Sequence, residues 1–95
     1  MNIVKALKSN TIKRELPNGL TEFKSFRKNG VLKEHYFLDE NSNFQGEYKY
    51  FHSNGTLSIH CFYKDGKRHG EYKWWWSDGT LGTHCFFKDD IHSSH

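Results

Sequence analysis

Apolar and polar residues alternate along the second half of the chain. The alternation is clearest at residues 46–51, 57–63, 70–75 and 81–87, and short Asn-Gly or Asp-Gly sequences separate these stretches. A period of two is typical of β-strands, because successive side chains of a strand point to opposite faces of a sheet. Asn54-Gly55 and Asp78-Gly79 favour tight turns that require positive φ angles. The pattern therefore predicts strands joined into hairpins.

The hairpin pattern is repeated. Residues 46–65 read GEYKYFHSNGTLSIHCFYKD and residues 70–89 read GEYKWWWSDGTLGTHCFFKD, 24 positions later. A weaker copy, TEFKSFRKNGVLKEHYFLDE, occupies residues 21–40, and residues 12–16 with Asn18-Gly19 resemble one further, partial hairpin. Each unit needs a neighbour to bury its edge. We therefore expect an all-β fold, a single elongated and curved antiparallel sheet of tandem β-hairpins with six to eight strands.

The repeats also suggest how the chain is divided. We expect an N-terminal segment at residues 1–20, followed by three hairpin repeats at residues 21–45, 46–69 and 70–95. Within the first segment, residues 1–8 are the one stretch with room for a short helix.

A two-residue type I′ turn at each Asn-Gly or Asp-Gly site would fix the pairing within a hairpin. It predicts the pairs Tyr48–Cys61, Tyr50–Ile59, Phe51–Ser58, Tyr72–Cys85, Trp74–Thr83 and Trp75–Gly82. Alternation then predicts a largely apolar first face that bears Tyr48, Tyr50, Leu57, Ile59, Cys61, Tyr63, Tyr72, Trp74, Trp76, Leu81, Cys85 and Phe87. The second face is charged but has its own aromatic stripe, and it bears Glu47, Lys49, Phe51, His60, Phe62, Glu71, Lys73, Trp75, His84 and Phe86.

Composition supports a thin structure. Hydrophobic residues make up only 35% of the chain whereas aromatic residues reach 17%, so large rings rather than aliphatic side chains must cover the sheet. The net charge is +3, with basic and acidic residues interleaved, so nucleic acid is not an expected partner. No stretch approaches the roughly 20 apolar residues of a membrane-spanning helix, and lysines interrupt the apolar residues of positions 1–8, so we expect no secretory leader there. We therefore expect a chain that is neither secreted nor membrane-spanning.

The chemistry of the side chains argues against a catalytic or metal site. The seven histidines and two cysteines show no C-x-x-C or H-x-x-x-H spacing of a tetrahedral zinc site, so we expect no metal. Cys61 and Cys85 would lie two strands apart, roughly 9.6 Å, which exceeds the about 7 Å that a disulfide tolerates. No nucleophile, base and orienting group can be assembled on an open sheet. We therefore expect no enzyme activity and no cofactor.

The sequence resembles the MORN repeat family. The resemblance rests on the GEYK motif, the Asn-Gly or Asp-Gly turn followed by Thr-Leu, and the linker KDGKRHGEYK, over residues 21–89. The segment HCFYKDGKRHGEYKWWWSDGTL is most similar to repeat proteins of giant DNA viruses of the marseillevirus type. The resemblance implies a non-enzymatic protein–protein interaction or structural module. Our main hypothesis is that the protein is a minor capsid-associated component of a virus particle. The alternatives are an antitoxin-like regulator that binds a toxin and a lipid-associated peripheral scaffold.

Exposed aromatic residues rimmed by polar groups are typical of interfaces. We therefore expect the second face to bind partners, with Trp75 as its most sensitive position because Gly82 would leave its ring unshielded. Basic residues in the linker turn are further candidates. The complete set of candidate contact residues is Phe51, Phe62, Lys67, Arg68, Trp75 and Phe86. We expect protein partners, either capsid proteins or copies of the chain itself, in a virion or in host cytoplasm, with membrane lipid as the weaker option.

Overall fold

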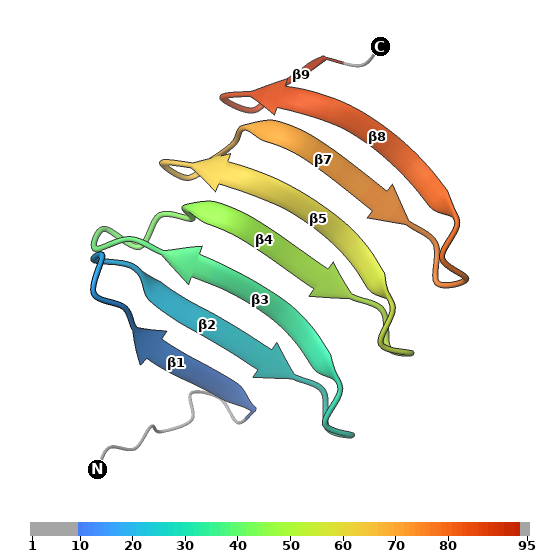
Figure 1. The fold of residues 1–95 in the computed structure, drawn as a ribbon, viewed down its shortest axis with the longest axis horizontal. Coiled ribbons are helices and arrows are strands. Elements are labelled where there is room, and N and C mark those ends of the chain that lie inside the picture. Colours follow the sequence, from blue (N-terminus) through green and yellow to red (C-terminus); the bar gives the residue numbers. More distant parts are fainter. Residues whose placement is uncertain (1–9, 94–95) are drawn as a thin grey trace.

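Strands and turns account for all regular structure in the computed structural model, which describes residues 10–93 (Figure 1). The alternating stretches of the sequence become strands because each can place its apolar residues on one face of a sheet. The strands are β1 (Thr11–Glu15), β2 (Thr21–Phe26), β3 (Leu32–Leu38), β4 (Gly46–Phe51), β5 (Leu57–Lys64), β6 (Lys67–Arg68), β7 (Gly70–Trp75), β8 (Leu81–Lys88) and β9 (Ile91–Ser93). The short helix expected at residues 1–8 lies outside the described residues.

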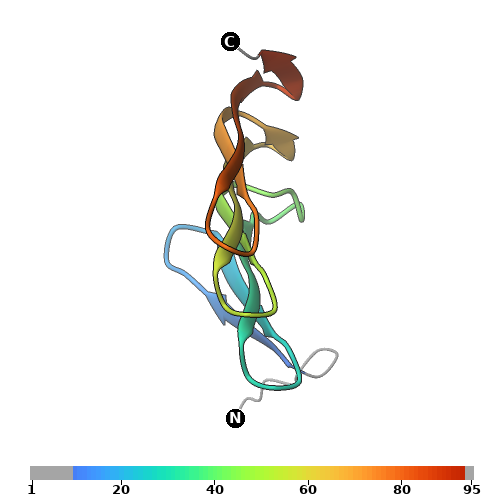
Figure 2. The ribbon, with the colours of Figure 1, turned by 90° about the vertical axis from the view of Figure 1, so that its right-hand side faces the viewer.

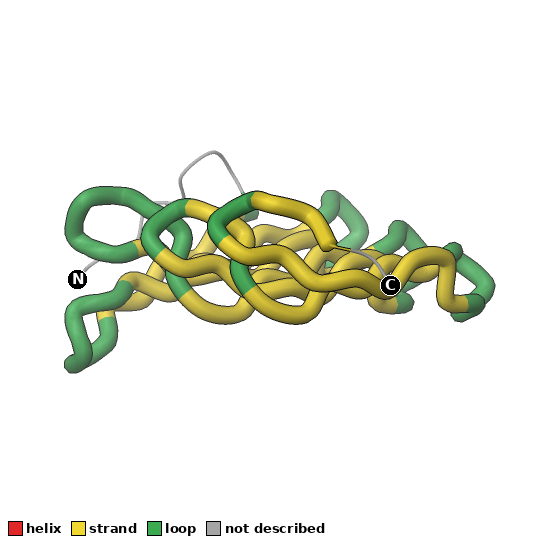
Figure 3. The backbone as a smooth tube through the Cα atoms, turned by 90° about the horizontal axis from the view of Figure 1, so that it is seen from above, coloured by secondary structure: helices red, strands yellow, loops and turns green. Residues whose placement is uncertain are grey.

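The strands form one antiparallel sheet in the order in which they occur along the chain, from β1 to β9, with the two-residue β6 paired beside β5. The all-β hairpin meander is thus confirmed. Viewed from its edge, the sheet is a single twisted layer (Figure 2). Its extents are 49 × 31 × 18 Å, and from above the loops gather at the strand ends (Figure 3). No second layer covers either face within the described residues.

The hairpin turns differ from the type I′ turns expected from the sequence. In the 52–56 turn, the Gly55 amide donates to the His52 carbonyl at 2.9 Å and the His52 amide donates to the Thr56 carbonyl at 2.8 Å. Gly55 has a φ of 91° whereas Asn54 does not have a positive φ. This is a type I turn followed by a left-handed glycine, the usual three-residue hairpin loop. The type I′ assignment at this turn was wrong.

The turn at Asp65-Gly66 has positive φ angles at both central residues, as was expected at Asn54-Gly55 and Asp78-Gly79. Asp65 and Gly66 have φ angles of 52° and 86°, and Lys64 pairs with Lys67 across them. The next linker has Asp90 where Gly66 stands, and Asp90 takes the same conformation with a φ of 72°. Its carboxylate accepts a hydrogen bond from the Arg68 amide at 2.8 Å. An aspartate can therefore replace the glycine because its short side chain binds the neighbouring turn.

A β-bulge near each turn changes the predicted pairing. Tyr50–Ile59 and Trp74–Thr83 pair as expected, but the register then shifts, so Phe51 pairs with Leu57 and Trp75 pairs with Leu81. The predicted pairs Phe51–Ser58 and Trp75–Gly82 are therefore wrong. The extra residue in the bulged strand is Ser58 in β5 and Gly82 in β8. The same shift lies between Ser25 and Phe26 in the first copy.

The bulge also places one leucine of each hairpin on the face opposite to the one expected. Leu57 shares a cross-strand pair, and therefore a face, with Phe51; Leu81 is related in the same way to Trp75. Both leucines were expected on the first face. A Cβ built on Gly82 would instead point into the ring of Trp74, which shows that the bulged position faces the first side of the sheet.

Candidate functional site

One face of the sheet is covered by aromatic rings that stack across the strands. We call it the tyrosine face, and its rings are Phe23, Tyr36, Phe44, Tyr48, Tyr63, Tyr72 and Phe87. Neighbouring centroids lie close together, 5.2 Å for Phe23 and Tyr36, 6.1 Å for Tyr36 and Tyr48, and 5.8 Å for Tyr48 and Tyr63. Rings from β2, β3, β4 and β5 thus form one continuous row. This row replaces the second layer that a two-layer fold would provide.

Burial among these rings changes the acidity of the tyrosine face. Burial raises the pKa of Tyr48 far above its usual value. The second cause is a 2.6 Å hydrogen bond that the Tyr48 hydroxyl donates to Glu34. Burial also raises the pKa of the Cys61 thiol to about 11. Cys61 and Cys85 are free cysteines with 2% and 3% exposure, and with Ser58 they are the buried residues of the described chain. Cys61 is therefore a neutral thiol at neutral pH, which makes it a poor nucleophile.

The opposite face carries the same arrangement of three side chains in each repeat. We call it the histidine face. In each copy, the Nε2 atom of a histidine lies 2.7–2.8 Å from a glutamate oxygen, and the histidine ring lies 5.2–5.5 Å from a phenylalanine ring. These Glu–His–Phe triads are Glu22–His35–Phe37, Glu47–His60–Phe62 and Glu71–His84–Phe86.

The triads lie in two straight rows across the strands. The strand register places lysine and histidine alternately in the first row, which runs Lys24, His35, Lys49, His60, Lys73 and His84. The second row is parallel to it and alternates glutamate with phenylalanine, in the order Glu22, Phe37, Glu47, Phe62, Glu71 and Phe86. A regular pattern of charges and rings thus repeats along this face.

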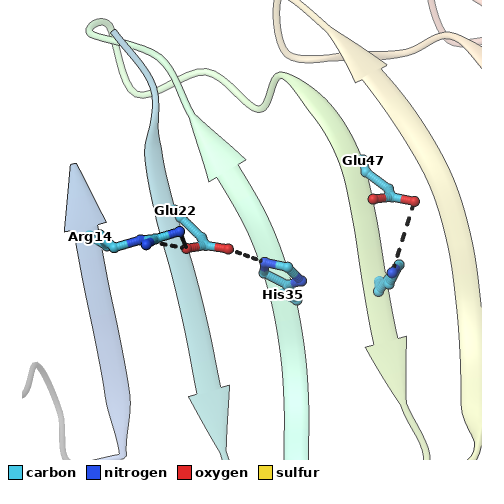
Figure 4. A network of polar contacts seen from close by, with 5 residues as sticks. Arg14, Glu22, His35 and Glu47 are labelled. Atoms are coloured by element: carbon cyan, nitrogen blue, oxygen red, sulfur yellow. Dashed lines mark hydrogen bonds and ion pairs between the residues drawn. The ribbon is translucent and has the colours of Figure 1, made fainter. Parts of the chain in front are cut away.

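The charges of the first triad are linked across three strands. Glu22 on β2 binds His35 on β3 at 2.8 Å and Arg14 on β1 at 3.1 Å, and Glu47 holds the corresponding place on β4 (Figure 4). The hydrogen bond from His35, followed by the attraction of Arg14 and other nearby cations, lowers the pKa of Glu22. The hydrogen bond from His84 lowers the pKa of Glu71 in the same way, with the charge of Lys73 adding to it. Glu22 and Glu71 therefore stay ionised below the usual range of a glutamate.

The structure separates the aromatic residues predicted for the partner surface. Phe62 and Phe86 belong to the glutamate–phenylalanine row, opposite Glu47 and Glu71. Phe51 and Trp75 are placed by their register on the same face but at the turn end, with the lysine–histidine row between the two groups. Trp75 was expected to stand opposite Gly82 with Phe86 as a neighbour. It pairs with Leu81 instead, and the indole ring above Gly82 is that of Trp74.

The two predicted basic residues also point to opposite faces. Lys67 pairs with Lys64, whereas Arg68 pairs with Tyr63 of the tyrosine face. The Arg68 guanidinium lies 4.5 Å from the centre of the Phe87 ring and 3.5 Å from a carboxylate oxygen of Asp90. Arg68 is therefore committed to contacts within the sheet, while Lys67 is exposed. Lys67 and Arg68 therefore do not form one basic patch.

The triads were missed in the sequence, although it carries a signal for them. In every repeat the histidine follows the glutamate by 13 residues. This constant separation would place the two side chains diagonally across a hairpin. Among residues 10–93 there is no cluster of three potential metal ligands and no helix long and apolar enough to cross a bilayer.

Comparison with known families agrees with this architecture. A family model described as MORN repeat variant matches residues 44–65 and residues 68–89. A MORN repeat variant is thus found at two consecutive repeats of the chain. MORN repeats commonly mediate protein or membrane-lipid interactions and are generally non-enzymatic, which indicates an interaction module. No curated protein and no solved structure matches the chain. The first copy, at residues 21–40, pairs in the same way as the matched MORN repeats but lies outside them.

Proposed function

We propose that this protein is a non-enzymatic protein-binding module that recognises its partner with the histidine face. The observation that carries the proposal is the Glu–His–Phe triad, which occurs three times with the same geometry on an open surface. Its outermost ring, Phe86, is 52% exposed, and Leu81 on the same face is 49% exposed. Exposed apolar groups surrounded by charges are typical of binding surfaces.

The tyrosine face is less suited to this role. Its rings contact one another from strand to strand, and its arginines are occupied: Arg27 donates to the Phe51 carbonyl at 2.7 Å and Arg68 covers Phe87. These contacts hold neighbouring repeats together. Among the residues that the structure describes, Phe62 and Phe86, by contrast, each form a ring contact with only the histidine of their own triad. Their outer sides are therefore available to a partner.

The charge pattern favours a protein over a lipid surface. Binding to anionic lipids usually requires about four to eight basic residues close together. In the lysine–histidine row of the histidine face each lysine has a glutamate two residues before it on the same strand, with Lys49 3.9 Å from Glu47 and Lys73 3.6 Å from Glu71. Alternating charge is instead suited to the alternating charges of a protein surface.

Several finer assignments belong to this proposal. Phe62, Phe86, Phe51 and Trp75 remain candidate contacts, together with the exposed Lys67, whereas Arg68 is left out because it packs on the other face. The assignments to a virus particle or to an antitoxin gain no support from the family match, and the proposal does not depend on them.

Site-specific photo-crosslinking tests the proposal. A benzophenone amino acid would replace Phe62 in the full chain, inside cells that express it, and the matched control would carry the same group at Tyr50, which was expected on the first face. We expect discrete protein adducts from position 62 that are weak or absent from position 50. Equal adducts from both positions would overturn the assignment to this face.

A vesicle assay separates the lipid alternative. The purified chain would be sedimented with phosphatidylserine vesicles, in parallel with the Phe86→Ala variant. We expect no cosedimentation of either protein at physiological salt. Salt-sensitive binding that Phe86→Ala abolishes would show that the histidine face binds lipid instead.

A further inference from the structure

We infer that the histidine face binds the same face of a second copy of this chain. This inference rests on the proposed function, because it names the partner of the surface already assigned. Its basis is the order of charged and aromatic residues along each strand, which makes the face complementary to itself.

Six strands carry one of two pairs of side chains on the histidine face. Strands β2, β4 and β7 carry a glutamate and, two residues later, a lysine. Strands β3, β5 and β8 carry a histidine and, two residues later, a phenylalanine. Neighbouring strands run in opposite directions, so the lysines share one row with the histidines and the glutamates share the other row with the phenylalanines.

A two-fold axis that runs between the two rows brings unlike groups together. It places every strand over the same strand of the second copy and exchanges the two rows. Lys49 then faces Glu47 of the second copy, and His60 faces Phe62 of the second copy. The same exchange applies to the pairs on β2 and β7 and on β3 and β8.

The alternative two-fold axis, parallel to the strands, would place the lysine–histidine row over itself. With that axis along a strand, like charges face each other, which is unfavourable. With the axis between two strands, lysine faces histidine and glutamate faces phenylalanine, so no opposite charges meet. Only one of the two face-to-face arrangements is therefore electrostatically complementary. Isologous pairing of this kind is the commonest form of protein self-association.

The glutamates have an oxygen available for the second copy. Within the described residues, the contacts of Glu47 and Glu71 with their histidine and lysine neighbours all use Oε2. The Oε1 atoms of these two residues make no ion pair or hydrogen bond in that part of the chain. The lysines are likewise held loosely, at 3.6–3.9 Å, and can reach a carboxylate across the interface.

The twist of the sheet limits the size of this interface. Adjacent strands rotate by about 20–25°, so contact is closest around the middle strands. Five strands at about 4.8 Å spacing and seven residues at about 3.3 Å each correspond to roughly 550 Å² per copy. That area is at the low end for specific interfaces. We therefore expect a reversible dimer that high salt weakens.

Sedimentation velocity over a range of protein concentrations tests the dimer. The test variant is Lys49→Glu, which places two glutamates against each other across the axis. The matched control is Lys13→Glu, which makes the same change in charge on the tyrosine face, where Lys13 pairs with Phe23. We expect Lys49→Glu to raise the dimer dissociation constant by about 10-fold or more, and Lys13→Glu to leave it unchanged.

A charge exchange provides the stringent version of this test. The double variant Glu47→Lys/Lys49→Glu restores opposite charges across the axis, so we expect it to regain dimerisation. Lys73→Glu serves as a second disrupting variant should thermal melting show that Lys49→Glu does not fold. A wild-type chain that stays monomeric at about 1 mM, or equal dimerisation of the Lys49→Glu and Lys13→Glu variants, overturns the inference.

The crosslinking experiment distinguishes this inference from the proposed function. An adduct at position 62 with the mass of two copies supports both. An adduct with a different protein, together with monomeric sedimentation, overturns the dimer and leaves the protein-binding function in place. The absence of any protein adduct overturns both.

Discussion

The two faces of this sheet are built from the same strands but are organised in different ways. On the tyrosine face the rings contact one another across strand boundaries. The Tyr48 ring, for example, contacts three others, those of Tyr36, Phe44 and Tyr63. On the histidine face, each Glu–His contact joins groups within one repeat and the outermost ring, that of Phe86, is exposed. We therefore expect the tyrosine face to contribute more to stability than the histidine face, which is the one proposed for recognition.

Removing the central ring of each face is the strongest test of this comparison. We expect Tyr48→Ala to lower the free energy of unfolding by about 3 kcal/mol, because it removes a half-buried ring from the stack. It also leaves Glu34 without its hydrogen bond. Phe62→Ala, its counterpart on the histidine face, should cost about 1 kcal/mol, since less apolar area is buried there. Urea denaturation measures both values. Equal losses would show that both faces contribute alike to stability.

The position of the bulge offers a second test. Gly82→Ala should lower the free energy of unfolding by about 1–2 kcal/mol, because the new methyl group would displace the Trp74 ring. The same substitution in a Trp74→Ala background serves as the control, and there the cost should disappear. A cost that persists without the Trp74 ring would mean that position 82 does not face the tyrosine side.

The smallest expected effect is a difference in pH dependence between the faces. The pKa values of Glu22 and Glu71 are lowered in the folded chain, so their contribution to stability is present above about pH 4.5 and is lost as the pH falls through the lowered values. The pKa values of Tyr36 and Tyr48 are raised by burial, so their contribution is present below about pH 10 and is lost as the pH rises beyond it. Acid should thus weaken the histidine face and alkali the tyrosine face.

Thermal melts across the pH range measure these two effects. The double variant Glu22→Gln/Glu71→Gln should lose less stability than the wild type below pH 4.5, with the alkaline loss unchanged. Tyr48→Phe should reduce the alkaline loss alone. Identical acid profiles for the wild type and the glutamine variant would contradict the role of the triads in stability.

Much of the fold could be predicted from the sequence because its repeats are nearly identical. The exact offset between residues 46–65 and 70–89 identifies the strands, and the pairing of Tyr48 with Cys61 was predicted correctly. The bulge could not be predicted in this way. Leu57 and Ile59 are both apolar, so the alternation reads the same whether or not an extra residue lies between them. An Asn-Gly dipeptide likewise fits either a type I′ turn or a type I turn with a left-handed glycine.

The candidate site was only partly predictable, for a related reason. Alternation assigns His60 and Phe62 to the correct face, but it does not reveal that Glu47 bonds diagonally to His60, because that contact depends on side-chain reach across a hairpin. The sequence grouped Arg68 with Lys67 in one basic turn, and it did not show that the linker contains its own short strand. The pairing of β6 with β5 reverses the chain and directs Arg68 to the tyrosine face.

The meander order also determines how the protein responds to mechanical load. The first and last strands lie at opposite edges of the sheet (Figure 1). A pulling force applied between these edges acts across the strands, so it opens backbone hydrogen bonds one after another instead of shearing a whole ladder at once. We therefore expect hairpins to peel away one at a time under such a load, so that the sheet would lengthen in steps of about one repeat.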